Sequence, residues 1–528
     1  MTSKKVCFIN NNYYLYERES YWDPILKKSR QRKSTLVGKC DKDGNLIAPA
    51  KKRMDYVNST FPVGPLSIFY ATAKELELKS HIEDVIDVES DMASNILCLV
   101  LNQIVSRRPV EKLDTWVLRN PIVKWEDLDP KNINREAFGK ALSNLCTIYQ
   151  DGSVEDYGLA LQYEMSKVWN DKDHEPAQFY YDVTKQRYYG TKSFYGEPGY
   201  IPGGTNKNVV GFGLVTSRTH HYPILCRPIR GSKHDTITVQ DTVNTLDAWG
   251  FEDLTLILDR GMVSKENIKF IMDSGYNQVG IVPETNKDVW KYITKWTSEE
   301  ITKPQYLVAR PSGETVYLKG WTAPLLGRQK MKLAVVEDPK RKLNEQIGRD
   351  QLLRELEGIP SKKRLKEIKT ELGKQVIIVK GRRGFKVDQK KVKENKKGDG
   401  RFLMFSTDLK MNTEEMFFVY FQRDVVEKAF CTLKGELRLG PIRYRRRDRI
   451  DAYSTIVYLA YLLWSWTERK LKKKYPNMSL TEVLELVEDV SWIEFKSGKL
   501  YKEWVTRLTN EQTKMLKYLG AIQFLPVS

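Results

Sequence analysis

The sequence has few cysteines, and none stands at the spacing of a metal site. Its 528 residues include six cysteines that are scattered along the chain, at Cys7, Cys40, Cys98, Cys146, Cys226 and Cys431. The lack of any C-x-x-C pair argues against both a disulfide framework and a cysteine-based zinc site. We therefore predict free thiols in a reducing compartment.

Apolar export and membrane signals are also missing from the sequence. The first residues, MTSKKVCFINNNYYLY, contain no apolar core followed by a small-residue cleavage site, which argues against a secretory signal. The longest apolar run, Ile456–Trp466, is too short to cross a bilayer and is typical of a buried helix. We therefore expect a soluble, cytoplasmic protein.

Positive charge is in clear excess. The chain has 87 Lys and Arg against 68 Asp and Glu, which gives a formal net charge of +19 and a pI near 9.3. This balance favours a polyanionic partner, most often nucleic acid, because contacts to phosphates release condensed counterions. A merely basic soluble protein is the alternative. The 28 Tyr and 12 Trp argue against a disordered chain.

The stretch from Tyr420 to Ile450 contains the most informative pattern. At offsets of 0, 3, 7 and 14 residues, one continuous helix would place four side chains within an arc of about 60°, those of Tyr420, Arg423, Glu427 and Lys434. Arg438, at offset 18, would return to that face. An apolar stripe beside them would seat the helix on a core, at Val419, Val426, Phe430, Leu433 and Leu437. A carboxylate among Tyr, Arg and Lys suits phosphate binding near a metal.

Residues 178–282 predict an α/β segment. Three strands are expected first, at Phe179–Thr184, Val209–Ser217 and Tyr222–Pro228. A helix, a strand, a helix and a strand then follow, at Thr236–Trp249, Leu254–Leu258, about Lys265 to Gly275, and Gln278–Val282. This order is the one expected of a ribonuclease H-like core, so the predicted fold class is α/β.

Two aspartates of this segment are candidate metal ligands. Asp182 lies within a strand, where Asp is depleted and where burial without a partner would be costly. Asp259 follows a buried strand, at the end where open α/β sheets bind ligands, although it could also be a simple turn residue. With Glu427 they make three carboxylates, enough to hold two divalent cations about 3.5–4 Å apart.

The flanking segments are harder to assign. Residues 1–172 predict a hairpin near Ser34–Pro49 and helices at Glu89–Val105 and Asn132–Leu145, which could bind DNA or simply pack. Residues 284–400 predict an inserted subdomain with strands and a charged helical part, so the core would resume at 401–474. In the insertion, Lys386–Lys397 could be a solvated or a phosphate-contacting loop, and three tryptophans could pack or stack on a base, Trp290, Trp296 and Trp321. Residues 475–528 predict a C-terminal helical segment.

The motifs of this chain resemble those of one group of DDE transposases from bacterial and archaeal insertion sequences. The spacing Tyr420-x2-Arg423-x3-Glu427-x6-Lys434 is similar to that group's Y-R-E-K signature. The blocks YYDVT and LILDRGM, the run G-S-K-H-D-T-I-T at 231–238 and R-I-D-A-Y at 449–453 extend the resemblance over roughly residues 175–470. Tyr453 stands where many relatives carry His.

The resemblance implies a function and a set of site residues. Asp182, Asp259 and Glu427 would coordinate two Mg²⁺ ions, for which Mn²⁺ could substitute, in a ribonuclease H-like fold that cleaves the ends of an element and joins the 3′ ends to target DNA. A DNA clamp would consist of Tyr420, Arg423, Lys434 and Arg438, and the Arg443–Arg449 cluster could extend it or be a solvated face. A homodimer on the terminal inverted repeats, in a prokaryotic nucleoid, follows from that task.

Other functions remain open at this point. A catalytically inactive or domesticated DNA-binding relative would have the same fold, and loss of an acidic residue would indicate it. A different nuclease with this core, such as a resolvase, is disfavoured by the large insertion and by the Tyr, Arg and Lys arrangement.

Overall fold

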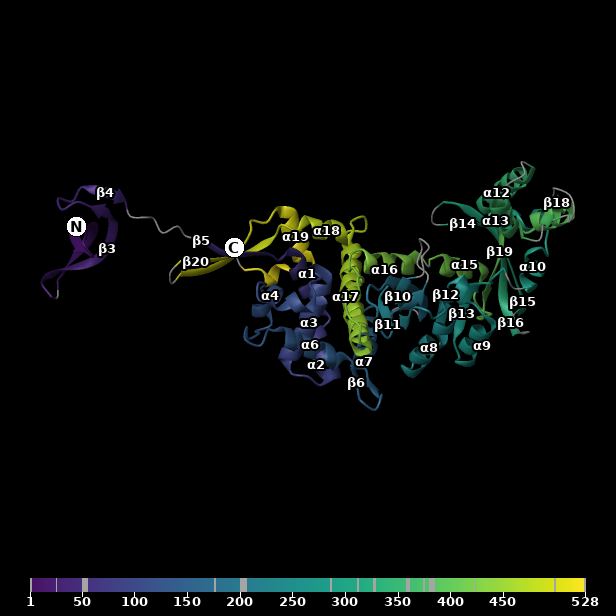
Figure 1. Cartoon of the computed structure of the whole chain (residues 1–528), viewed down its shortest axis with the longest axis horizontal. Coiled ribbons are helices and arrows are strands. Elements are labelled where there is room, and N and C mark those ends of the chain that lie inside the picture. Colours follow the sequence, from purple (N-terminus) through teal and green to yellow (C-terminus); the bar gives the residue numbers. More distant parts are fainter. Residues whose placement is uncertain are drawn as a thin grey trace. The chain divides into compact units, whose positions relative to one another are not determined.

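The computed structural model describes residues 2–24, 26–49, 56–174, 177–199, 207–284, 287–310, 313–325, 329–357, 361–373, 376–378, 385–422, 424–497 and 500–526. They form two compact units (Figure 1). The smaller unit comprises Met1–Thr60, Trp492–Thr506 and Pro526–Ser528, and the larger comprises Phe61–Ser491 and Arg507–Leu525. The predicted N-terminal region 1–172 therefore contributes to both units.

The smaller unit consists of strands. A four-stranded antiparallel sheet has the order β1-β2-β3-β4, with β1 (Thr2–Ile9), β2 (Asn12–Asp23), β3 (Lys28–Cys40) and β4 (Leu46–Pro49). The predicted hairpin of β3 and β4 is confirmed, and the Asp41 carboxylate closes its turn by accepting from the backbone N–H of Asp43 and Asn45.

A second sheet joins distant parts of the sequence. Its order is β21-β20-β5, with β5 (Tyr56–Pro62), β20 (Ser491–Ser497) and β21 (Leu500–Val505). The sequence W-I-E-F-K-S-G-K-L-Y-K-E-W-V has the alternating character of a hairpin. The segment 475–528 therefore differs from the helical one expected, although its helices α18 (Leu480–Leu486) and α19 (Asn510–Tyr518) are present.

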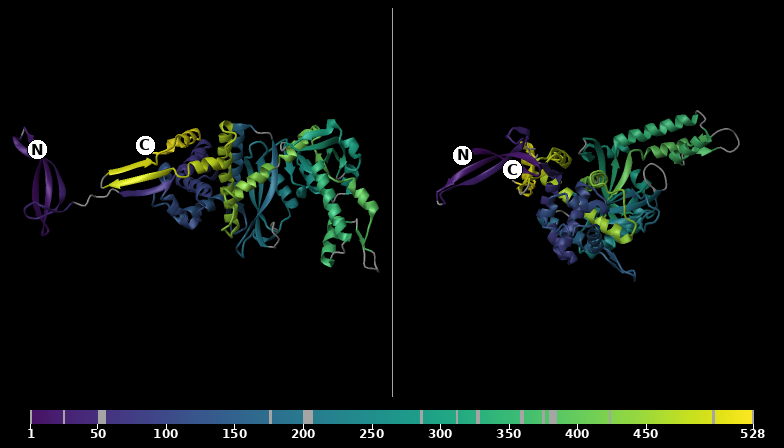
Figure 2. Two further views of the ribbon diagram at one scale, coloured as in Figure 1. Left: turned by 90° about the horizontal axis from the view of Figure 1, so that it is seen from above. Right: turned by 60° about the vertical axis from the view of Figure 1, so that its left-hand side comes forward.

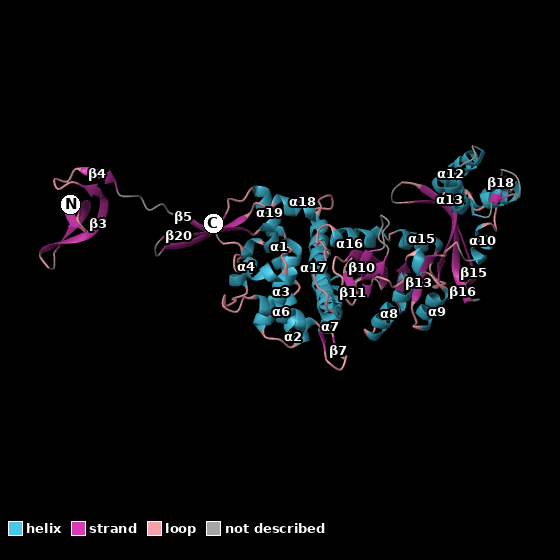
Figure 3. Cartoon of the chain, in the orientation of Figure 1, coloured by secondary structure: helices cyan, strands magenta, loops and turns pink. Residues whose placement is uncertain are grey.

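Helices of residues 61–174 pack against one long central helix. The 28-residue α17 (Arg447–Lys474) is buried along most of its length and contacts α1 (Gly64–Glu75), α3 (Ser90–Val105), α6 (Arg135–Leu145), α7 (Tyr157–Asp173) and β11 (Pro223–Arg230). Figure 3 shows these helices on one side of α17 and the strands of the large sheet on the other. The apolar run Ile456–Trp466 is thus a buried helix, as predicted. Within the described residues, no helix has the length and apolar character needed to cross a bilayer.

The two helices predicted in this region are confirmed as α3 and α6. Asn134 caps α6 by accepting from the backbone N–H of Ala137. In α3, all residues from Ala93 to Ile104 are buried, so its role is packing. Shorter elements complete the region, namely α2 (Leu78–Ile86), η1 (Val110–Lys112), α4 (Leu113–Val117), α5 (Ile122–Trp125), β6 (Thr147–Ile148) and β7 (Val154–Glu155).

The predicted α/β order is confirmed between residues 178 and 281. The chain forms β8 (Gln178–Arg187), β10 (Lys207–Ser217), β11, α8 (Asp235–Ala248), β12 (Thr255–Leu258), η2 (Arg260–Met262), α9 (Lys265–Asp273) and β13 (Asn277–Ile281), with a short additional strand β9 (Glu197–Gly199). The strand order is β11-β10-β8-β12-β13. β10 is antiparallel to β8 and β11, whereas β12 is parallel to β8 and β13.

The strands of the insertion continue this same sheet. β14 (Leu307–Ala309), β15 (Thr315–Leu325) and β16 (Gln329–Glu337) appear where the sequence predicted them, and β16 pairs with β19 (Arg401–Ser406), which pairs with β13. The sheet thus has ten described strands. One apolar cluster joins β16 and β19 to Ile268 of α9 and to Val289 and Ile293 of α10 (Lys287–Ile293). Residues 284–337 therefore share the core and differ from the separate subdomain expected.

A helical hairpin forms the rest of the insertion. α12 (Pro339–Glu357) and α13 (Lys362–Leu372) lie side by side (Figure 2), with Leu356, Ile368 and Leu372 buried between them, and they form the charged helical part that the sequence predicted. The Lys-rich run 386–397 is largely the helix α14 (Gln389–Lys396) and differs from the loop expected. The remaining elements of the insertion are α11 (Ser298–Ile301), η3 (Pro304–Tyr306), β17 (Val376–Ile378) and β18 (Phe385–Val387).

A buried ion pair ties the insertion to the core sheet. Arg401 of β19 lies directly across from Glu337 of β16, with 2.8 Å between Nη2 and Oε2, and both side chains are at most 3% exposed. Its Nη1 also donates to the backbone carbonyls of Ile293 and Trp296, at 2.8 and 2.7 Å. The guanidinium therefore satisfies acceptors from three segments.

Arg401→Met is expected to lower the free energy of unfolding by about 3–5 kcal/mol, because it leaves a buried carboxylate and two carbonyls without this donor. Urea unfolding followed by circular dichroism measures the loss. Arg364→Met is the matched control, since Arg364 pairs with Glu355 at the surface and should cost less than about 1 kcal/mol. Equal losses in the two variants would contradict this reading of the buried pair.

Candidate functional site

The central strand β8 directs successive side chains to opposite faces of the sheet. The buried Tyr180 hydroxyl donates to the backbone carbonyl of Val419 in α15 (Thr413–Phe421), at 2.8 Å. The next residue, Tyr181, lines a cavity with Thr238 and Thr242 of α8 on the other face. Because side chains in a strand alternate, Asp182 belongs to the face that carries α15.

Asp259 lies beside Asp182 on the neighbouring strand. In the parallel pairing of β12 with β8, Leu258 is opposite Tyr181, so the next residue of each strand is one of the two aspartates. Paired strands lie about 4.7–4.9 Å apart, and both aspartates are half-buried. The Oδ1 of each accepts from the backbone N–H of the following residue, at 2.7 Å, which restricts its rotation.

The loop after Asp259 is braced by residues of α8 and α9. The buried Asn267 donates from Nδ2 to the carbonyls of Met262 and Thr236, at 2.9 and 2.8 Å. The Thr236 hydroxyl donates to the carbonyl of Gly261, at 3.1 Å. Thr236 belongs to the G-S-K-H-D-T-I-T run, so this run supports the backbone next to Asp259. Asn267 was not predicted as a site residue, because nothing in its local sequence distinguishes it.

Glu427 lies on α16 (Asp424–Lys434), a helix that contacts β8. The predicted apolar stripe seats it, since all of its members are buried, Val419, Val426, Phe430, Leu433 and Leu437. Glu427 itself is exposed. The helix that carries the third predicted carboxylate therefore packs against the strand that carries Asp182.

The predicted single helix is wrong. α15 ends at Phe421 and is capped by Gln422, whose backbone N–H donates to the carbonyl of Phe418, and α16 begins at Asp424 and ends at Lys434. Arg438 lies beyond that end with a φ of +44° and so does not return to the same helix face. Helical phase alone does not report where a helix ends, and the local stop signal here is Gly435, directly after the last residue of α16.

The predicted clamp residues have different surroundings. Tyr420 is 5% exposed at the end of α15, whereas Lys434 is exposed at the end of α16. Arg423 lies outside the described residues. Tyr420 packs edge-on against Phe421, with 5.4 Å between ring centroids. Its ring is therefore buried in the protein interior.

The donor types fit a divalent metal, although a complete ligand group is not assembled. Carboxylate oxygens are the ligands that Mg²⁺ prefers, and the register of β8 and β12 places two of them side by side. Among the residues that the structure describes, no group of three or more His, Cys, Asp or Glu side chains is placed to hold a metal. The fit therefore rests on the aspartate pair and on the proximity of α16 to β8.

The three candidate tryptophans pack inside the insertion. Trp296 and Trp321 meet edge to face, with 4.6 Å between ring centroids, and both pack on the apolar cluster of β16 and β19. Trp290 is 37% exposed and lies against Gly398. The contacts of Trp296 and Trp321 correspond to the packing role expected as one alternative.

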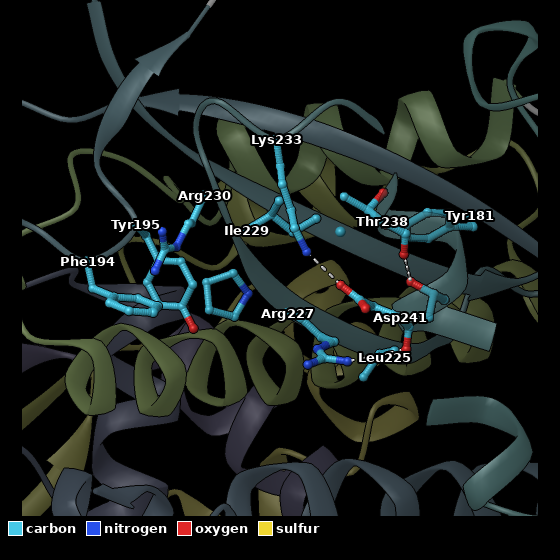
Figure 4. A pocket seen from close by; sticks show the side chains of 13 residues that line it. Tyr181, Phe194, Tyr195, Leu225, Arg227, Ile229, Arg230, Lys233, Thr238 and Asp241 are labelled. Atoms are coloured by element: carbon cyan, nitrogen blue, oxygen red, sulfur yellow. Dashed lines mark hydrogen bonds and ion pairs between the residues drawn. The ribbon is translucent and has the colours of Figure 1, made fainter. Parts of the chain in front are cut away.

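A cavity of about 230 Å³ lies on the opposite face of the sheet from Asp182 (Figure 4). Two of its basic side chains are paired: Lys233 is 2.8 Å from Asp241 in the same lining, and Arg227 donates at 2.8 Å to the hydroxyl of Thr245, which lies outside it. Tyr195, at its rim, donates to Asp451 of α17 at 2.6 Å. The lining thus holds three basic side chains, Arg227, Arg230 and Lys233, against one acid, Asp241.

Tyr180→Phe tests the contact that holds α15 on β8. Removing the hydroxyl leaves the buried Val419 carbonyl without its donor, so we expect a loss of about 1–2 kcal/mol in the free energy of unfolding. Tyr181→Phe is the adjacent control, because its buried hydroxyl makes no hydrogen bond of normal geometry and its removal should be neutral. Chemical unfolding of both variants measures the difference, and a loss in Tyr181→Phe alone would refute this assignment.

Asp451 predicts a pH dependence of stability. Burial raises the pKa of its carboxyl to about 6, although the Tyr195 hydroxyl opposes the shift. Because this pKa lies above the ordinary value of about 3.9, the stabilisation is complete below about pH 4 and is lost as the pH rises through about 6. Asp451→Asn should remove this slope and raise stability at pH 7.5 by up to about 3 kcal/mol, measured by urea unfolding between pH 4 and 8. Asp241→Asn, an exposed control, should keep the slope.

Comparison with known proteins identifies the family of this chain. Residues 179–463 match the family model described as "Transposase DDE domain". The solved structures include a similar chain, from the cryo-EM structure of the piggyBac transposase synaptic complex with hairpin DNA, at 12% identity over 80% of this chain and 79% of that one. The TM-score is 0.39. No curated protein matches the chain. Since the family match spans more than half of the 528 residues, the chain belongs to the transposase DDE domain family.

Proposed function

We propose that this protein is a transposase that binds the ends of an insertion sequence, cleaves them, and joins the 3′ ends to target DNA. The observation that carries the proposal is the register of β8 and β12, which places Asp182 and Asp259 side by side on the face that α15 covers. Family membership supports DNA cleavage as the reaction class. The strand order β11-β10-β8-β12-β13 supports a ribonuclease H-like core.

Three carboxylates would hold the metal ions. Asp182 and Asp259 are fixed by backbone N–H donors, and Glu427 extends from α16, so the set combines two restrained ligands with one exposed ligand. Two bound Mg²⁺ ions would supply Lewis acidity and charge neutralisation at the reacting phosphorus. The protein's own contribution is to orient these oxygens through the sheet register and through the braced loop after Asp259.

Basic residues near α16 are the proposed DNA contacts. Lys434 is exposed at the end of this helix, and Arg438 follows in the next loop. In this proposal Arg423 and Tyr420 complete the clamp, with Tyr420 acting mainly by packing the end of α15. The excess positive charge of the chain would add sequence-independent attraction to duplex DNA. Element ends must be paired during transposition, so a DNA-bound homodimer is part of the proposal.

A cleavage assay tests the role of the carboxylates. The substrate is linear duplex DNA containing the sequences that flank the coding region, incubated with Mg²⁺ or with a chelator. Asp182→Asn, Asp259→Asn and Glu427→Gln are each expected to lower strand cleavage by at least about 100-fold, since each removes a metal-binding charge from phosphoryl transfer. DNA binding should remain.

Glu266→Gln is the matched control, because Glu266 is an exposed carboxylate of α9 that is not among the proposed ligands. It should cleave at the wild-type rate. Cleavage by Glu427→Gln at the wild-type rate would contradict the assignment of Glu427 as the third metal ligand. A wild-type protein that binds the DNA but never cuts it would instead favour an inactive DNA-binding relative.

A further inference from the structure

A second basic site lies between the helical region and the loop that follows α16. A cavity of about 190 Å³ is lined by Arg107 and Arg108, which follow α3, and by Arg438, Arg443 and Tyr453. These residues come from segments more than 300 positions apart in the sequence, so only the fold brings them together. Four arginines around one small cavity form a concentrated positive site.

The positive charge of this cavity is not neutralised by neighbouring carboxylates. Within the described ranges of the chain, no ion pair joins a carboxylate to Arg107, Arg108, Arg438 or Arg443. The buried Nε of Arg107 has no hydrogen-bond partner. Burial lowers the pKa of Arg107, and repulsion from Arg438 lowers it further, while Glu436 opposes the shift. The one acid that lines the cavity, Glu111, is exposed and lies 3.9 Å from Arg135.

The backbone at this site is held in an unfavourable conformation. Arg107 has a φ of +58° and Arg438 a φ of +44°. Both values lie in the left-handed region, which residues other than glycine rarely adopt. Such conformations persist where the surrounding structure enforces them, and they cluster at binding sites. Here both belong to arginines that line the same cavity.

Buried hydrogen bonds make the cavity rigid. Gln103 of α3 donates to the carbonyl of Leu437 at 2.6 Å, and the Tyr453 hydroxyl of α17 donates to the carbonyl of Leu439 at 3.0 Å. The Asn102 side chain bonds both the N–H and the carbonyl of Arg108, each at 2.9 Å. These bonds fix both halves of the site before any ligand arrives, which reduces the ordering cost of binding.

We propose that this arginine cavity binds a single phosphate of the DNA backbone, outside the carboxylate site. The inference rests on the proposed function for its DNA partner. Guanidinium groups match phosphate in charge and in hydrogen-bond geometry, and an anion here would relieve the repulsion between Arg107 and Arg438.

The position of the cavity suits a contact beside the cleaved strand. Gly440, in its lining, lies against the side chain of Gln186, to which an added Cβ would come within 3.1 Å. Gln186 is four residues beyond Asp182 in β8, which corresponds to about 13 Å along a strand. A phosphate in the cavity would therefore hold the DNA backbone at a point removed from Asp182 and from the phosphate that reacts there.

The test replaces both strained arginines by glycine, and the single variant Arg107→Gly, which keeps the clamp residue Arg438, must itself weaken binding for the cavity to be a site separate from the clamp. Glycine adopts a positive φ without strain, so Arg107→Gly/Arg438→Gly should fold, with a melting temperature close to that of the wild type. Binding of full-length protein to a random-sequence 30-base-pair duplex is measured by fluorescence anisotropy across a salt series. We expect about ten- to hundredfold weaker binding at low salt and a slope of log K against log salt that is shallower by about 1. The control Arg119→Gly, at an exposed arginine of the same helical region, should keep the wild-type slope.

Inorganic phosphate distinguishes the possible sources of the ligand. Phosphate should raise the melting temperature of the wild type more than that of the double variant, and it should compete with DNA. A double variant that loses this stabilisation but keeps the DNA slope would show a site for free phosphate and overturn the proposal. An unchanged slope and affinity would overturn it as well, while the carboxylate assignment would stand. A wild-type protein that binds no duplex would overturn the proposed function and this proposal together.

Discussion

The parallel pairing of β8 with β12 is the constraint on which the candidate site depends. Side chains alternate along a strand, so a shift of one residue would send Asp182 to the face of α8 and break its alignment with Asp259. Tyr180 and Tyr181 hold the strand on both faces, one through the Val419 carbonyl and one in the cavity beside α8. The chemistry is thus aligned by packing on either side of one strand.

One continuous sheet carries both the core and the insertion. β16 and β19 extend it beyond β13, and the buried Arg401 connects these strands to the carbonyls of residues 293 and 296. A rigid extension of this kind keeps β13 and β12 in a fixed position next to β8. The helical hairpin of α12 and α13, with its own small apolar cluster, is the part of the insertion that packs independently.

The helix α17 has a comparable role on the other side of the sheet. It contacts β11 and the helices of residues 61–174, and its Tyr453 holds the loop that contains Arg438. In the sequence, Tyr453 was only a departure from a related motif. In the structure, the same residue helps to shape the arginine cavity, because its hydroxyl reaches a carbonyl that is distant in the chain.

The sequence by itself determined the order of strands and helices from 178 to 281 and the apolar stripe of α16, because both depend on local periodicity. The three carboxylates stay a prediction from a compact motif. Tertiary structure alone decided that the insertion joins the sheet and that Arg107 meets Arg438. These features depend on contacts between segments far apart in the chain. Periodicity cannot report such contacts, since it describes only the neighbours of a residue along its own helix or strand.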